Sequence, residues 1–264
     1  MTADGSPVLF QRDGAVATLT LNRPQVLNAI SLELGEALLG HLRAVAKDPE
    51  IRAVVLTGTG RGFSAGADFS GDIPATPEGH DDLRARLDDL FNPAITEMRA
   101  MPKPIIGAIN GVTAGIGMSF ALACDLVLAA ESASFLFAFS GIALSPDGGL
   151  IAHCAARIGL TRTAQLALVG DRVPAKQALD WGLVNAVHPD AELAAEAQAL
   201  AAKLGGGPTV AHAGAKEQLT WVVSDLATRL EGEAGVQQRN AETHDYPEGV
   251  AAFQEKRPAQ FLGR

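Results

Sequence analysis

Residues 52–68 read RAVVLTGTGRGFSAGAD, an apolar run that passes into a stretch of glycine and other small residues. The run at 52–57 predicts a short buried strand, because it is continuous, aliphatic and bounded by glycine. Residues 103–117, KPIIGAINGVTAGIG, repeat this arrangement, with a buried strand predicted over 103–110 and then a small-residue loop that opens an apolar helix at 118–124. Buried strands that alternate with loops and helices in this way are typical of an α/β fold.

The rest of the chain extends this pattern. Further strands are predicted over 15–21, 125–129 and 134–137, and helices over 31–47, 189–204 and 210–230. Residues 70–89 are polar and predict a surface loop that leads into a helix. Because helices dominate the last hundred residues, we expect a core over 1–204 and a C-terminal helical region over 205–264, divided at the Gly-Gly-Gly-Pro break of 205–208.

Composition excludes several classes of protein. The chain has 264 residues, 47% of them hydrophobic, which is enough to build a continuous core. A formal net charge of -9 argues against electrostatic binding to nucleic acid or to an anionic membrane surface. Residues 1–12 lack the pattern of a signal peptide, and no run reaches about 18 apolar residues, so a soluble cytoplasmic protein is expected. Cys124 and Cys154 have no CxxC spacing and the six histidines occur singly, which favours buried free thiols and no metal site.

Two motifs in the first loop are judged by their spacing. Residues 58–62 hold three glycines after a buried strand, but a dinucleotide-binding loop requires GxGxxG entering a helix directly, so nicotinamide binding is not expected. Residues 62–66 match GxSxG, the nucleophile elbow of α/β-hydrolases, with Ser64 as the nucleophile. That elbow requires the strand to run directly into the serine, whereas this strand is predicted to end at Thr57. A hydrolase stays open only as an alternative that requires a histidine within hydrogen-bond reach of Ser64.

Residues 63–68 and 111–117 carry the chemistry that the sequence suggests. The second of these loops leads into a helix N-terminus, where unpaired backbone N–H groups and the helix dipole favour negative charge. Two N–H donors that converge from such loops would polarise a thioester carbonyl and stabilise an enolate. Loss of one such donor costs on the order of 3 kcal/mol in activation free energy. Glycine-rich loops are also common as ordinary turns, so the loops alone leave both interpretations open.

Short motifs lie in a fixed order along the whole chain. They are LNRP at 21–24, NAI at 28–30, VLTG at 55–58, FSAGAD at 63–68, KP at 103–104, NG at 110–111, ACD at 123–125, GD at 170–171, GLV at 182–184, EG at 248–249 and FQEKR at 253–257. In this order they resemble the crotonase superfamily of enoyl-CoA hydratases and isomerases. The resemblance implies a spiral of ββα turns with a C-terminal helical trimerisation region, and a homotrimer or a dimer of trimers. It also implies an acyl-CoA thioester as substrate, with no separate cofactor because CoA is part of that substrate.

The resemblance implies a set of site residues. It places the two N–H donors of an oxyanion hole on Ala67 and Ile116. The residues that it implies for contacts with the CoA thioester are Val26, Leu27, Ala65, Gly66, Asp68, Gly115 and Lys256. Of these, Lys256 is expected to meet a CoA phosphate, in the same subunit or in a neighbouring one, so that a positive pocket is expected on an acidic protein.

Two positions depart from the family pattern. Hydratases of this family use two glutamates, and this chain has Ser119 and Phe139 at the corresponding positions. A hydroxyl and a phenyl ring cannot replace the paired carboxylates that activate water and protonate the α-carbon, so efficient hydration is not expected. One carboxylate remains nearby, Asp147 in the sequence SPDGG. This segment resembles the isomerase branch of the family, including the ring-epoxide isomerase of phenylacetyl-CoA breakdown.

The resemblance implies that Asp147 takes a proton from the acyl chain, and a single base can then return it to another carbon. Burial among Phe139, Ile142 and Met118 is expected to raise the pKa of Asp147, which suits a base that gives its proton back. Three alternatives stay open. Asp147 caps the helix that begins near Gly148, the protein is an enoyl-CoA hydratase that uses Asp147 and water, or the protein binds acyl-CoA without catalysis.

Overall fold

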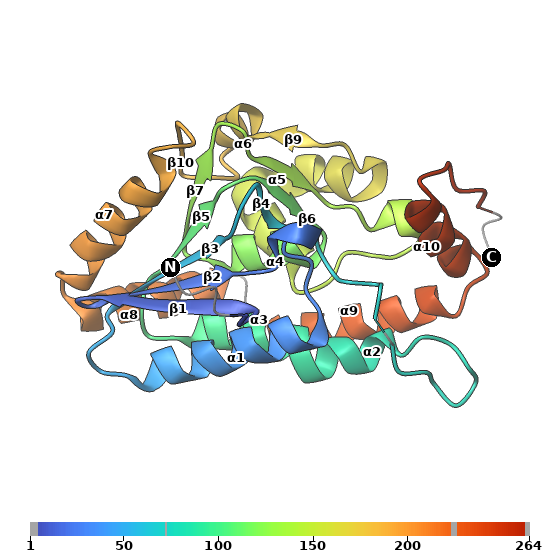
Figure 1. Cartoon of the computed structure of the whole chain (residues 1–264), viewed down its shortest axis with the longest axis horizontal. Coiled ribbons are helices and arrows are strands. Elements are labelled where there is room, and N and C mark those ends of the chain that lie inside the picture. Colours follow the sequence, from blue (N-terminus) through green and yellow to red (C-terminus); the bar gives the residue numbers. More distant parts are fainter. Residues whose placement is uncertain (1–4, 72, 223–225, 262–264) are drawn as a thin grey trace.

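A six-stranded sheet forms the centre of the computed structural model, which describes residues 5–71, 73–222 and 226–261 (Figure 1). In sheet order its strands are β1 (Val8–Asp13), β2 (Val16–Leu21), β3 (Ala53–Gly58), β5 (Ile105–Ile109), β7 (Leu126–Ala130) and β10 (Ala186–His188). β1 and β2 are antiparallel, and the other neighbours are parallel. All residues of β5 are buried, as expected for a central parallel strand whose two faces are covered. The predicted α/β class is confirmed.

A second sheet consists of short strands, which in sheet order are β4 (Gly62–Ser64), β6 (Val112–Ala114), β8 (Ser134–Leu136) and β9 (Val173–Pro174). β4, β6 and β8 each follow a strand of the first sheet, and helices come next, so the chain repeats a ββα turn. The stretches 58–71 and 111–117 were predicted as loops throughout, which is wrong in part. Each contains a strand of three residues, too short to show a period in the sequence.

Helices cover both faces of the six-stranded sheet (Figure 1). On one face lie α1 (Leu32–Lys47) and α3 (Asn92–Ala100), which pack against each other, and on the other lies α7 (Leu193–Gly205), in contact with β3 and β5. The N–H of Leu34 donates to Oγ of Ser31 at 3.3 Å, which confirms the predicted cap of α1. The apolar stripe of this helix is buried and comprises Leu34, Leu38, Leu39, Leu42 and Val45.

Further helices connect and cover the strands. They are α2 (Leu83–Arg86), α4 (Ile116–Ala123), α5 (Leu150–Val169) and α6 (Ala175–Trp181), with the short 3-10 helices η1 (Pro24–Val26) and η3 (Ser140–Ile142) and the π-helix η2 (Leu87–Phe91). Helix α2 lies inside the stretch 70–89 that was predicted as a loop, because the carboxylate of Asp82 accepts the N–H of Ala85 at 2.8 Å and so caps a helix there. Cys124 and Cys154 are buried and free, as predicted. Among the described residues, no helix is both long and apolar enough to cross a membrane.

Three helices follow the predicted break at 205–208, namely α8 (Thr209–Val222), α9 (Leu226–Ala241) and α10 (Asp245–Glu255). α8 returns to the core, where Nζ of Lys216 lies 2.8 Å from a carboxylate oxygen of Asp125. α9 packs beside α2, and α10 packs beside η3. Of the helix predicted over 210–230, residues 223–225 lie outside the described part of the chain. The C-terminal helices therefore reach the loops that carry the expected site residues.

Candidate active site

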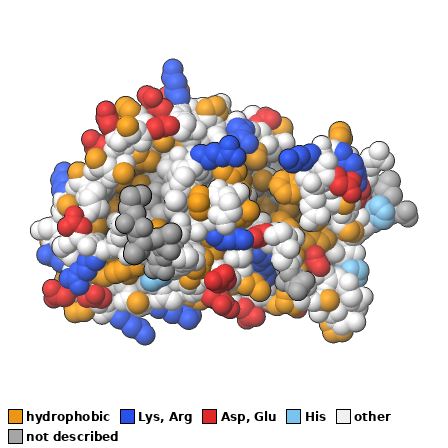
Figure 2. All heavy atoms as spheres, viewed as in Figure 1, with side chains coloured by type: hydrophobic (Ala, Val, Ile, Leu, Met, Phe, Trp, Pro, Cys, Tyr) orange, Lys and Arg blue, Asp and Glu red, His pale blue; other side chains and the backbone are white. Residues whose placement is uncertain are grey.

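A cavity of about 330 Å³ lies between the ends of β4 and β6, the turn η3 and helix α10. Its larger apolar lining residues are Phe69, Leu136, Phe139, Ile142, Leu144 and Phe253. Figure 2 shows hydrophobic side chains gathered in the hollow beside α10. Ala67, Ile116 and Asp147, which were predicted as catalytic, all line this cavity. A wider groove of about 730 Å³ between α7 and the sheet contains none of the predicted site residues.

The peptide between Gly66 and Ala67 is held in one orientation. The N–H of Ile30 donates to the carbonyl oxygen of Gly66 at 2.8 Å. Because the C=O and N–H groups of a trans peptide point in opposite directions, the N–H of Ala67 is turned away from Ile30. Gly66 has a φ of 103°, which glycine adopts without strain. Within the described residues, the N–H of Ala67 donates no hydrogen bond.

Helix α4 supplies a second free N–H to the same cavity. Gly115 precedes the helix with a φ of 52° and a ψ of -133°, which a side chain would strain. Its own N–H donates to the carbonyl oxygen of Leu136 at 3.1 Å, whereas the N–H of Ile116, the first of the helix, donates to no described residue. A Cβ added to Gly115 would lie 3.7 Å from Cα of Gly66, so the two loops are in contact. Two unpaired N–H donors thus belong to residues of one cavity, one of them at the positive end of a helix dipole.

Asp147 is the sole ionisable residue among the described residues that line this cavity. It is 6% exposed. Its Oδ2 accepts a hydrogen bond from Nε2 of Gln237 at 3.0 Å, and its Oδ1 has no hydrogen-bond partner in the described part of the chain. Burial raises the pKa of Asp147 to about 7, against the opposing effects of the Gln237 hydrogen bond and the charge of Arg86. The expected direction of this pKa shift is therefore found, with burial as its cause.

The alternative in which Asp147 caps a helix is wrong. Helix α5 begins at Leu150, its N-cap is Gly149, and no side chain caps it. Asp147 takes part through its backbone alone, since its carbonyl oxygen accepts the N–H of Leu150 at 3.1 Å. The carboxylate is hydrogen-bonded to Gln237 on another helix.

Helix α9 holds the segment that carries Asp147. Oε2 of Glu233 accepts the N–H of Gly149 at 2.7 Å. Oε1 of Gln237 accepts the N–H of Ser145 at 2.9 Å, and Nδ2 of Asn240 donates to Oγ of Ser145 at 2.8 Å. These three residues were not predicted as site residues from the sequence. They recur at helical spacing, but α9 is polar on most of its sides, so the spacing does not distinguish them from residues that face solvent.

The two positions that depart from the hydratase pattern have different surroundings. Phe139 lines the cavity. Ser119 is fully buried, and its Oγ donates to the backbone carbonyl oxygen of Asp147 at 2.9 Å. Neither residue gives the cavity a second ionisable group. Ile142 lines the cavity as predicted, whereas Met118 is fully buried and lies outside the lining, so its predicted place was wrong.

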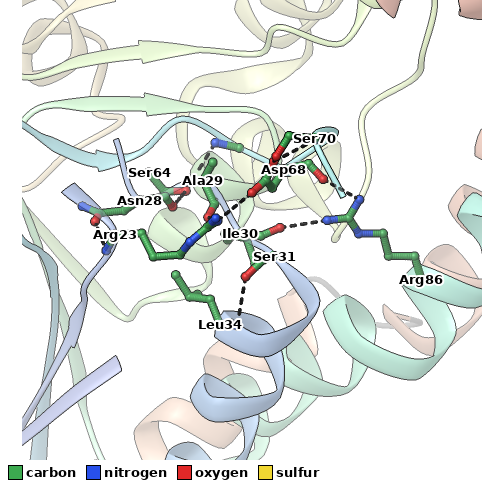
Figure 3. A network of polar contacts seen from close by, with 11 residues as sticks. Arg23, Asn28, Ala29, Ile30, Ser31, Leu34, Ser64, Asp68, Ser70 and Arg86 are labelled. Carbon is green, nitrogen blue, oxygen red and sulfur yellow. Dashed lines mark hydrogen bonds and ion pairs between the residues drawn. The ribbon is translucent and has the colours of Figure 1, made fainter. Parts of the chain in front are cut away.

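Four expected CoA contacts lie outside the cavity lining. The carboxylate of Asp68 forms an ion pair with Arg23 at 2.7 Å (Figure 3). Val26 is 40% exposed, and Leu27 follows it with a left-handed φ of 51°. Lys256 ends α10 with a φ of 55°. The expected contacts that do line the cavity are Ala65, Gly66 and Gly115.

The hydrolase alternative based on Ser64 is wrong. Its side chain is fully buried, and Oγ donates to the carbonyl oxygen of Asn28 at 2.9 Å and accepts the N–H of Gly66 at 3.3 Å (Figure 3). All six histidines lie in the described part of the chain, and none is hydrogen-bonded to Ser64. In that same part, no group of three or more His, Cys, Asp or Glu residues is placed to hold a metal ion.

Known proteins are similar to this chain over nearly its whole length. The family profile described as enoyl-CoA hydratase/isomerase matches residues 11–264. The 1,2-epoxyphenylacetyl-CoA isomerase of Escherichia coli is 39% identical over 259 residues, which cover 97% of this chain and 98% of that protein. A probable enoyl-CoA hydratase of Rhodobacter capsulatus is 36% identical over 258 residues, with coverage of 97% and 98%.

A solved structure is also similar to this chain over nearly its whole length. The crystal structure of an enoyl-CoA hydratase from Mycobacterium avium subsp. paratuberculosis has a TM-score of 0.88 to this chain at 35% identity, and covers 97% of this chain and 98% of its own. The expected fold is thereby confirmed. The similar proteins carry both hydratase and isomerase names.

Proposed function

This chain belongs to the enoyl-CoA hydratase/isomerase family, and we propose that it isomerises an enoyl-CoA or a related CoA thioester. One observation carries the proposal. Among the described residues, Asp147 is the single ionisable side chain that lines the cavity, and Ala67 and Ile116, whose N–H groups are unpaired there, line it as well. Two donors suit a thioester oxygen that becomes negative, and one carboxylate suits a proton that is removed and returned.

In this reaction the thioester oxygen of a 3-enoyl-CoA accepts hydrogen bonds from the N–H groups of Ala67 and Ile116. Oδ1 of Asp147, which has no hydrogen-bond partner among the described residues, removes a proton from the α-carbon. The electron pair of that C–H bond delocalises into a dienolate, which the two N–H groups stabilise. Asp147 then gives the proton to the γ-carbon. The product is a 2-enoyl-CoA, and no atom is gained or lost.

The pKa of about 7 for Asp147 suits both halves of this cycle, because near neutral pH the group both accepts and releases a proton readily. Oδ2 stays engaged with Gln237 at 3.0 Å, which keeps the carboxylate in place while Oδ1 acts. Hydration would also require a group to activate water, and Ser119 and Phe139 supply no second carboxylate. The surroundings of Asp147 therefore favour proton transfer over the addition of water.

The test is product analysis with a 3-enoyl-CoA and a trans-2-enoyl-CoA, in deuterium oxide and in water labelled with heavy oxygen. We expect interconversion of the two enoyl-CoA isomers, with deuterium at carbon and no heavy oxygen in the product. A 3-hydroxyacyl-CoA that contains heavy oxygen would instead identify a hydratase. Tight binding with no turnover of any substrate would identify an acyl-CoA binding protein.

The proposal extends to the CoA contacts and to the assembly. We propose that Val26, Leu27 and Lys256 border the CoA moiety outside the cavity, and that the protein works as a homotrimer or a dimer of trimers in the cytoplasm. Large apolar side chains of α5 and α6 are exposed in the single chain, which supports burial in an assembly; they include Leu160, Leu168, Val169 and Leu179. Size-exclusion chromatography with light scattering measures the number of subunits in the assembly.

A further inference from the structure

Arg86 is a buried guanidinium behind the loop that carries Ala67. It ends helix α2 and is 8% exposed. Its Nη1 donates to the carbonyl oxygen of Asp68 at 3.0 Å, and its Nη2 donates to the carbonyl oxygen of Ile30 at 2.8 Å (Figure 3). Within the described residues its Nε is buried without a hydrogen-bond partner, and Arg86 takes part in none of the ion pairs found there. A buried charge that is held mainly by backbone carbonyls is costly, so a specific role is expected.

The two carbonyl groups that Arg86 holds belong to Ile30 and Asp68, and Ile30 is hydrogen-bonded to the residues on both sides of Ala67. The N–H of Ile30 donates to Gly66 at 2.8 Å, and the N–H of Asp68 donates back to Ile30 at 3.0 Å. Ile30 therefore fixes the peptides on both sides of Ala67, and Arg86 fixes Ile30 and Asp68 together. The hydrogen bond from Ile30 to Gly66 sets the direction of the Ala67 N–H. Movement of Ile30 would therefore turn that N–H away from a bound thioester oxygen.

The same guanidinium also acts on Asp147. Its positive charge lowers the pKa of Asp147, whereas burial of the carboxyl raises it. Gln237 of α9 holds the carboxylate of Asp147, Glu233 of the same helix holds the N–H of Gly149, and Ser119 of α4 donates to the backbone carbonyl of Asp147. The ionisable groups that act on Arg86 itself are Asp68, Tyr246 and Asp147. Arg86 is thus hydrogen-bonded to the loop of the N–H donor, and its charge also lowers the pKa of Asp147.

We infer that Arg86 is a positioning residue of the proposed reaction, which aims the Ala67 N–H at the thioester oxygen through its hydrogen bonds to Ile30 and Asp68. The inference rests on the proposed function. Arg86 does not line the cavity, so it acts through Ala67 and Asp147 and not by touching the acyl group. Phe69 and Phe91 lie beside the guanidinium, with ring centroids 6.0 Å and 5.3 Å from its carbon, and contribute to its burial.

The test compares Arg86→Met, Arg86→Lys and, as the matched control, Arg84→Met. Arg84 lies on the same helix, but its side chain pairs on the surface with Asp88 and Glu231. For Arg86→Met we expect kcat to fall about 10-fold to 100-fold with KM nearly unchanged. We also expect the acid limb of the dependence of kcat/KM on pH to move to higher pH, because the positive charge that lowers the pKa of Asp147 is lost. Arg86→Lys keeps the positive charge but not the planar pair of N–H donors that holds the two carbonyl oxygens. The acid limb of its kcat/KM profile should therefore stay near that of the wild type, while kcat still falls. Arg84→Met should match the wild type.

A second measurement does not depend on turnover. The carbonyl stretch of bound butyryl-CoA, labelled with heavy carbon at its carbonyl, reports hydrogen bonds to the thioester oxygen. We expect a shift to lower frequency in the wild type and in Arg84→Met, and a smaller shift in both Arg86 variants. An Arg86→Lys protein with the full carbonyl shift and wild-type kcat would overturn the inference, as would an Arg86→Met protein that loses thermal stability alone. Absence of the shift in the wild type would instead refute the proposed oxyanion site itself.

Discussion

Nε2 of Gln237 donates to Oδ2 of Asp147 at 3.0 Å, and this contact joins a C-terminal helix to the proposed base. Because the amide occupies one carboxylate oxygen, Oδ1 is the atom left free for the substrate. The same amide accepts the N–H of Ser145 at 2.9 Å, so its orientation is fixed from both ends. A residue 90 positions along the chain thereby holds one oxygen of the proposed catalytic group and lowers its pKa against the larger effect of burial.

Gln237→Met should move the acid limb of the pH profile upward. The hydrogen bond from Gln237 favours the charged carboxylate, so its loss raises the pKa of Asp147 further above its usual range. A bond of this type contributes roughly 1.5 to 3 kcal/mol, which corresponds to a shift of about one pH unit or more. The dependence of kcat/KM on pH measures the shift. Gln238→Met is the matched control, because Gln238 contacts Arg84 and Asp81 and not Asp147.

Asp147→Asn should reduce turnover by about 100-fold to 10,000-fold, the usual range for loss of a positioned acid or base. The amide has nearly the same shape and can still accept the Gln237 hydrogen bond, so binding of acyl-CoA should be retained. Rates with a 3-enoyl-CoA, together with calorimetric titration of a saturated acyl-CoA, separate the two effects. Asp89→Asn, a change at an exposed position, is the control. Unchanged turnover in Asp147→Asn would remove the proposed base.

Asp147→Asn should also stabilise the protein at alkaline pH. The folded pKa of about 7 lies above the ordinary value of 3.8, so the folded state holds a proton that the unfolded chain has released between these values. The free energy of unfolding therefore falls as pH rises through this window, and the cost of ionising buried Asp147 is complete above it. Asparagine cannot ionise, so urea unfolding should show the variant to be more stable near pH 8, by a few kcal/mol at most. This difference should shrink toward about pH 5. A difference that does not change with pH would contradict the assignment.

Ala67→Pro tests the oxyanion donor, since proline has no N–H. The N–H of Ala67 donates no hydrogen bond within the described residues, so the substitution removes no such bond there. We expect kcat to fall by about 100-fold to 1,000-fold, with a smaller effect on KM. Ala67→Gly keeps the N–H and is the control. Circular dichroism of the two variants checks that the fold is retained, and equal kcat values in folded proteins would exclude this donor.

Patterns that extend over five or more residues predicted the fold well. The continuous apolar runs of β3 and β5 and the capped amphipathic helix α1 are found where expected, because each buries a face whose period is visible in the sequence. β4 and β6 were missed, since three residues show no period. β1 was missed as well, because all of its residues after Leu9 are exposed and its sequence does not alternate.

The sequence by itself determined the α/β class, the family resemblance, the two small-residue loops and the single carboxylate of SPDGG. Each of these depends on local residue type and spacing. Only the tertiary structure decided that Ala67 and Ile116 line one cavity with N–H groups that no described residue accepts. It also decided that Asp147 is buried with one carboxylate oxygen free among the described residues. The contacts of Gln237 with Asp147 and of Arg86 with Ile30 are likewise tertiary. These are contacts between segments far apart in the chain, and their direction depends on how the two sheets and the C-terminal helices pack, which no local pattern encodes.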